Sequence, residues 1–100
     1  MIHRLKIWPE PFEELRLGAK TFEVRREDRQ GQRFEGGDVL RLQEWDPNRG
    51  PTGRTLDVQV TSTLRLYDTP PAWNINCGMV VVMAVRPLGG GEDTADRPAK

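Results

Sequence analysis

One hundred residues, of which 36% are hydrophobic and 30% charged, suit a single domain with a core and a large polar surface. Fifteen basic and fifteen acidic residues cancel, so the overall charge does not draw the chain to nucleic acid or to membranes. The sequence contains no apolar run of membrane-spanning length and no signal-peptide pattern, and the lone Cys77 cannot form an internal disulfide. We therefore expect a cytoplasmic protein without a membrane span.

The chain begins with a predicted strand, followed by a short helix. Residues 3–7 carry less polar side chains at every second position, which predicts a strand with one apolar face. Pro9 and Pro11 suit the first turn of a helix, because the N–H groups that proline lacks have no helical partner there in any case. Gly18 suits the end of this helix, where a left-handed residue is commonly required.

Residues 21–26 are predicted to form the second strand, and charged side chains are concentrated around it. In an extended chain, Phe22 and Val24 lie on one face, and Glu23 and Arg25 lie on the other. We expect the first face to pack into the core. The second face, together with Lys20, is expected to form a recognition or catalytic surface.

Three further strands are predicted in residues 38–45, 55–66 and 79–85. A turn over residues 46–53, rich in Pro, Gly and Asn, separates the first two of these strands. The second strand is long enough that we expect a bend or a bulge, and one of its faces is expected to carry Leu56, Val58, Val60, Ser62, Leu64 and Leu66. Pro87 is expected to end the last strand, so that residues 1–88 form the domain and residues 89–100 a disordered tail.

About five strands with one short helix between the first two predict an α+β fold. The strands and helices do not alternate as they do in parallel α/β sheets, so we expect a small β-barrel, either open or closed.

The residue patterns that usually hold metals or phosphates are absent from the sequence. One histidine and one cysteine cannot supply a zinc cluster, and Asp28, Asp38 and Asp46 lack the spacing of a calcium loop. The three glycines at 89–91 are followed by acidic residues rather than by the lysine-bearing helix of a phosphate-binding loop. We expect neither a metal nor a cofactor.

Lys20, Glu23 and Arg25 are the strongest candidates for a site. A lysine beside a glutamate can be held in place or, in a dry site, can take part in proton transfer. An arginine on the same strand face as the glutamate offers a planar fork for a phosphate, a carboxylate or a base edge. The alternative is a ladder of surface salt bridges with little effect on stability.

The three tryptophans allow either packing or base stacking. Core packing is favoured for Trp8 and Trp45, which lie at predicted strand ends. Trp73 lies in a proline-flanked loop, where exposure and contact with a ligand are equally well supported.

The spacing Gly18-x-Lys20-x-x-Glu23-x-Arg25 resembles the G-x-K-x-x-E-x-R signature of ASCH domains, a branch of the PUA-like superfamily. Further positions match, in the same order, a group of small uncharacterised ASCH-like proteins of bacteria and phages: His3, Leu5, Lys6, Pro9, Phe12, Asp28, Arg29, Gly37, Asp38, Leu40, Leu42, Glu44 and Trp45. The resemblance is strong over the first half of the chain and extends over the second half only in the strand pattern. It implies a PUA-like β-barrel with a cleft beside the first helix.

This resemblance also implies a role in RNA binding. We expect an RNA- or nucleotide-binding domain whose partner is RNA or a modified nucleoside or nucleotide. Its expected ligand contacts are Lys6, Lys20, Glu23, Arg25, Arg26, Arg29 and Trp73.

Two alternatives stay open. Some small ASCH proteins are amidohydrolases that remove an acyl group from N4-acylated cytidine with a lysine, a threonine and a glutamate. Lys20 matches their lysine and Glu23 stands at their threonine position, so a catalytic site here would use Lys20 to handle the proton and Glu23 as the base. The other alternative is a protein-interaction accessory module that uses the loop over residues 67–77.

Overall fold

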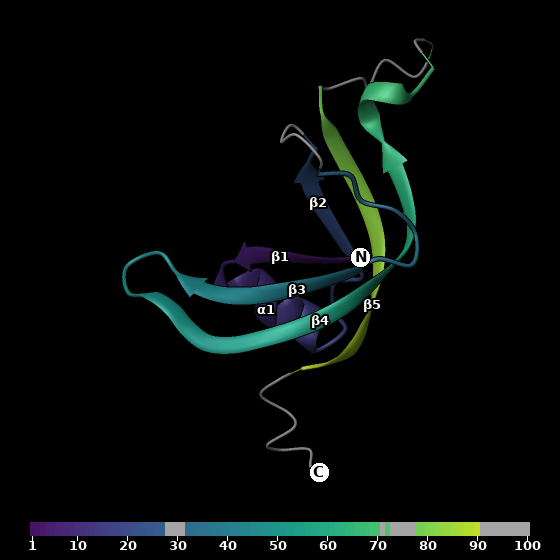
Figure 1. Cartoon of the computed structure of the whole chain (residues 1–100). Helices are drawn as coiled ribbons and strands as arrows, with labels where there is room; N and C mark the ends of the chain where they lie inside the picture. Colours follow the sequence, from purple (N-terminus) through teal and green to yellow (C-terminus); the bar gives the residue numbers. More distant parts are fainter. Residues whose placement is uncertain (28–31, 71, 73–77, 91–100) are drawn as a thin grey trace.

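The computed structural model describes residues 1–27, 32–70, 72 and 78–90, which form one curved sheet and one helix (Figure 1). The elements, in chain order, are β1 (Ile2–Ile7), α1 (Pro9–Arg16), β2 (Phe22–Arg26), β3 (Val39–Asp46), β4 (Gly50–Arg65), the 3-10 turn η1 (Leu66–Asp68) and β5 (Val80–Gly90). The predicted α+β class, with five strands and one short helix between the first two, is confirmed. None of the helices in this described part of the chain is long and apolar enough to cross a membrane.

The five strands form a half-barrel in the order β1-β3-β4-β5-β2. β1 runs parallel to β3, and the other neighbouring strands are antiparallel. The sheet curls around α1, and its two edges are β1 and β2 (Figure 1). The predicted barrel is therefore open between these two edge strands.

The core lies between the inner face of the sheet and α1. Phe12 and Leu15, one turn apart on the helix, are fully buried there. The other buried apolar side chains are Leu5, Ile7, Phe34, Leu40, Leu42, Leu56, Val58, Val60, Val81, Met83 and Val85. The predicted helix signals are confirmed: Pro9 and Pro11 lie in its first turn, and Gly18 follows its end with a φ of 81°.

The predicted orientation of the second strand is wrong. Phe22 and Val24 are 48% and 47% exposed, whereas Glu23 is only 4% exposed. The reason lies in the pairing with β5, where Glu23 is opposite Met83 and Arg25 is opposite Val81. Cross-strand partners project to the same side of a sheet, and Met83 and Val81 are core residues, so the two charged side chains are carried to the inner side.

The predicted irregularity in the long strand is confirmed, but the face predicted beyond it is wrong. The pairing of β4 with β5 shifts register between Val60 and Ser62. Val60 is buried before the shift, whereas Leu64 is 45% exposed after it. The extra residue of a bulge turns the following side chains to the other face, so Arg65 enters the inner side in place of Leu64.

The last strand runs further than predicted. Pro87 does not end it: β5 continues to Gly90, which is the register partner of Leu56. A second register shift, between Asp57 and Val58, accompanies Pro87, which agrees with the confinement of proline to irregular places in a sheet. The predicted tail beyond Gly90 lies outside the described residues.

Candidate functional site

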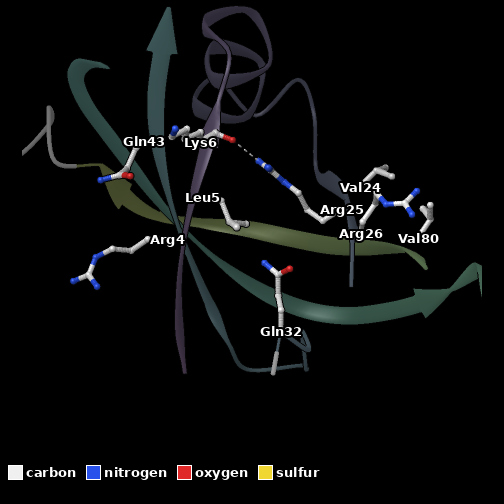
Figure 2. Close-up of a pocket in the computed structure, with 9 residues that line it drawn as sticks. All are labelled: Arg4, Leu5, Lys6, Val24, Arg25, Arg26, Gln32, Gln43 and Val80. Carbon is white, nitrogen blue, oxygen red and sulfur yellow. Dashed lines mark hydrogen bonds between the residues drawn. The ribbon is translucent and has the colours of Figure 1, made fainter. Parts of the chain in front are cut away.

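Arg25 joins the two edges of the half-barrel. Its Nη2 atom, on β2, donates a hydrogen bond of 2.9 Å to the backbone carbonyl of Lys6 on β1 (Figure 2). Among the described strands, β1 pairs with β3 alone, so its other backbone edge is open to side-chain hydrogen bonds such as this one. The gap between β1 and β2, hereafter the seam, is therefore crossed by a side chain rather than closed by a backbone ladder.

The smaller of two cavities along the seam brings four of the sequence-predicted residues together. It has a volume of about 330 Å³ and is lined mainly by Lys6, Trp8, Lys20, Glu23, Arg25 and Trp45. These residues come from β1, from the entry to α1, from the segment between α1 and β2, from β2 itself and from the end of β3. The four residues therefore line one common hollow rather than separate parts of the surface.

The larger cavity, of about 680 Å³, adjoins the first one, because Lys6 and Arg25 line both. Its other walls include Arg4, Leu5, Arg26 and Gln32. Figure 2 shows Leu5 and Gln32 on the side of β1 that faces Arg25, with Arg4 on the opposite side. Among the described residues, four basic side chains and no acidic one line this cavity, so it can attract an anion although the net charge of the chain is zero.

Glu23 is the buried acidic group of the smaller cavity. Its Oε1 atom accepts a hydrogen bond from the Val24 backbone N–H at 3.3 Å and lies 3.4 Å from Nε of Arg25. The contact with Arg25 has the distance of an ion pair but not the geometry of a hydrogen bond. The other oxygen, Oε2, is buried and has no hydrogen-bond partner among the described residues.

The two lysines of the smaller cavity lie against aromatic rings. Nζ of Lys6 is 4.0 Å from the ring centre of Trp45, and Nζ of Lys20 is 5.1 Å from that of Phe22. Both distances are within the range of cation–π attraction. Trp8 is 63% exposed, so the predicted core packing of Trp8 is wrong, and its indole is available to a ligand.

A buried polar cluster anchors the wall next to the larger cavity. Glu27 accepts hydrogen bonds from Arg65 at 2.9 and 3.1 Å, from Tyr67 at 2.7 Å and from the Phe34 backbone at 2.7 Å. Burial alone would raise the pKa of Glu27, but these hydrogen bonds together lower it. The cluster joins the end of β2 to β4 and holds the segment that leads from Gln32 into the core.

A second cluster holds α1, and with it the wall near Trp8. Arg54 on β4 donates to both oxygens of Glu44, at 2.9 and 3.0 Å, and to Glu13 on the helix at 2.7 Å. These contacts raise the pKa of Arg54, and the hydrogen bond from Arg54 is the main reason that the pKa of Glu44 is lowered despite its burial. Arg54 also covers the ring of Phe12, 4.7 Å from its centre.

Sequence reasoning did not identify either of these clusters. Arg65 lies on the polar side of the strand predicted over residues 55–66, Arg54 directly precedes that strand, and the partners of both are distant in sequence. The clearest available signal was the length of the strand, which indicated a bulge but not its position.

Of the other sequence-predicted contacts, Arg26 lines the larger cavity, and Arg29 and Trp73 lie outside the described residues. The same holds for most of the loop over residues 67–77. Within residues 1–27, 32–70, 72 and 78–90, no group of three or more His, Cys, Asp or Glu side chains is arranged to hold a metal ion.

Comparison with known proteins assigns the family. Residues 2–82 match the family described as "Domain of unknown function (DUF3850)", and the chain belongs to this family. Its structure is similar to the crystal structure of the hypothetical protein PH0355, with a TM-score of 0.58 and 14% identity over 88% of this chain and 100% of that chain. Protein PF0455 from Pyrococcus furiosus has a TM-score of 0.48 and 18% identity over 88% of this chain and 98% of that chain. No curated protein matches, and likeness to PH0355 at this identity shows the fold alone.

Proposed function

We propose that this protein binds RNA or a nucleotide along the seam between β1 and β2. One observation carries the proposal: Lys6, Lys20, Glu23 and Arg25, which come from separate segments, line a single cavity together with indole rings. Cations for phosphate, a carboxylate for a base edge and an aromatic surface for stacking are the groups that recognise unpaired nucleotides.

The composition favours a small or unstacked ligand over a long duplex. Electrostatic affinity for a nucleic-acid backbone grows with the number of phosphates neutralised, and this chain has no net positive charge. The basic side chains instead gather locally, around the larger cavity. A single nucleotide or a splayed-out base, with its base in the smaller cavity and its phosphate near the larger one, matches this distribution.

The resemblance of the Gly18 to Arg25 segment to ASCH domains supports the same proposal. We propose on this ground that the chain is an ASCH-like member of the PUA-like superfamily. On the ground of the lone Cys77, we further propose that it acts in the cytoplasm.

Titration with single-stranded RNA oligomers and with nucleoside monophosphates, followed by tryptophan fluorescence and calorimetry, tests the proposal. Lys20→Ala is expected to weaken binding, as is the double variant with Arg25→Ala. Arg86→Ala is the matched control for Lys20→Ala: this arginine lies on β5 outside both cavities, where it donates hydrogen bonds to Gln59, and each of the two substitutions removes one positive charge. Equal affinities of the wild type, the control and the double variant would refute the proposal.

A hydrolytic function at the same site is a second candidate. Lys20 and Glu23 line one cavity, and a carboxylate oxygen of Glu23 has no partner in the described residues, as a general base requires. Incubation with N4-acylated cytidine and chromatography of the products tests it. Product formation that Lys20→Ala abolishes would make the protein an amidohydrolase on a modified nucleoside. Turnover no higher than that of the variant would exclude this substrate.

A further inference from the structure

The unpaired oxygen of Glu23 indicates what kind of ligand the smaller cavity selects. Glu23 is 4% exposed, and its Oε2 atom has no hydrogen-bond partner in the described part of the chain. A buried carboxylate oxygen without a donor is costly, because the hydration it has lost is not replaced. Oε2 therefore lacks a donor among the described residues, and a ligand that places an N–H group against it removes this deficit.

The neighbouring cations do not supply that donor. Lys6 lies over Trp45 and Lys20 over Phe22, while the Nη2 atom of Arg25 is bonded to the Lys6 carbonyl. Each of these three cations has such a partner, and the remaining unpaired donor, Nε of Arg25, lies 3.4 Å from the other Glu23 oxygen, Oε1, rather than against Oε2. The arrangement thus keeps Oε2 of Glu23 as a free acceptor within a cavity that also contains positive charge.

We propose that Glu23 selects ligands whose aromatic ring carries an exocyclic amino group, such as cytosine or adenine, over their oxo counterparts. This inference rests on the proposed function and specifies the ligand. The amino group projects from the ring and can reach a recessed oxygen, and it provides the donor that Glu23 lacks. An oxo group at the same position would bring a second acceptor against the carboxylate, and the N–H of the oxo form lies on the ring, set back from the position that the amino group reaches.

The geometry of the cavity agrees with a ring in this position. Trp8 is 63% exposed and lines the same cavity as Glu23, so a base that stacks on its indole would have its edge near Glu23. The sugar and phosphate would then lie toward Lys6 and Arg25, which open onto the larger cavity. Glu23 determines specificity in this arrangement, and the cations determine affinity for the anionic part.

Two matched pairs of nucleosides test the inference by calorimetry: cytidine against uridine, and adenosine against inosine. Each pair exchanges an exocyclic amino group for an oxo group at one ring position, and the adjacent ring nitrogen changes from an acceptor to an N–H donor. The wild type is expected to prefer the amino member of each pair by roughly tenfold or more, the usual effect of one hydrogen bond to a charged group. Glu23→Gln is expected to bring both ratios close to unity, because an amide can either accept or donate. Lys20→Gln is expected to keep the ratios, because it leaves Glu23 in place.

The outcomes separate the two proposals. Binding of nucleosides without an amino preference in the wild type, or with the same preference in Glu23→Gln, would overturn the role of Glu23 and leave the proposed function standing. Absence of binding for all four nucleosides and for RNA would overturn both. If Glu23→Gln does not fold, as judged by circular dichroism, the wild-type ratios still decide the amino preference.

Discussion

The guanidinium of Arg25 reaches across the seam to the backbone of Lys6, with 2.9 Å between Nη2 and the carbonyl oxygen. The same side chain lies 3.4 Å from the buried carboxylate of Glu23. Arg25 thus holds the two edges of the half-barrel together. It also places a positive charge next to the buried carboxylate of Glu23. The candidate site and the integrity of the sheet depend on the same residue.

Arg25→Ala is expected to lower the free energy of unfolding by about 1–3 kcal/mol, because it removes a charged hydrogen bond and leaves Glu23 buried without its cation. Urea unfolding of both proteins measures this difference. Arg86→Ala, which removes an exposed arginine, is expected to change stability by no more than about 0.5 kcal/mol. Equal losses in the two variants would contradict a structural role for the seam contact.

Glu27→Gln is expected to destabilise the protein by about 3 kcal/mol, because it leaves Arg65 without its buried carboxylate partner. The Arg65 side chain is 11% exposed and that of Glu27 is 2% exposed, so water does not compensate for the loss. Glu35→Gln is the control, since Glu35 is 54% exposed and 3.9 Å from the same arginine. A double-mutant cycle that combines Glu27→Gln with Arg65→Met measures the coupling free energy between these two side chains. A coupling free energy near zero would contradict the prediction.

Stability is expected to decrease as the pH falls below about 4, partly through Asp38. Burial alone would raise the pKa of Asp38, but hydrogen bonds with His3, with the Glu35 backbone and with the N-terminal ammonium lower it from its ordinary value of 3.8. The folded state therefore binds fewer protons than the unfolded state in this range, so stability rises with pH there. The contribution is fully present above the ordinary pKa and is lost as the pH falls through the lowered one.

Asp38→Asn tests this directly. The variant is expected to show a shallower dependence of the unfolding free energy on pH between about 5 and 2 than the wild type. Glu27 and Glu44, whose pKa values are also lowered, retain their own contributions, so the dependence is reduced rather than abolished. Thermal unfolding at several pH values measures it, and an unchanged slope would show that Asp38 does not contribute.

Trp8→Ala is expected to separate binding from stability. The side chain is 63% exposed, so its loss is expected to change the free energy of unfolding by no more than about 0.5 kcal/mol. If a base stacks on it, the binding free energy of a nucleotide is expected to fall by about 1–3 kcal/mol. Phe12→Ala is the contrasting variant: Phe12 is fully buried, and its removal is expected to cost about 3–5 kcal/mol of stability. Unchanged nucleotide affinity in Trp8→Ala would remove this ring from the site.

The sequence by itself determined the strand and helix pattern. The alternation in residues 3–7 matches the buried side chains of His3, Leu5 and Ile7, and the proline and glycine signals match the helix over Pro9–Arg16. These features depend on local geometry, where neighbouring residues and the period of the backbone decide the outcome. The period of two in an extended strand likewise predicts that Glu23 and Arg25 lie on the same face.

Only the tertiary structure decided which face of each strand is inside. Alternation shows that Glu23 and Arg25 share a side, but pairing with Met83 and Val81 carries that side inward and leaves Phe22 and Val24 exposed. In the same way, the register shift after Val60 turns Arg65 toward Glu27, a residue 38 positions away in the chain. Register is set by contacts between distant segments, so a period of two in the sequence leaves it undetermined. The buried carboxylate at the seam follows from this pairing.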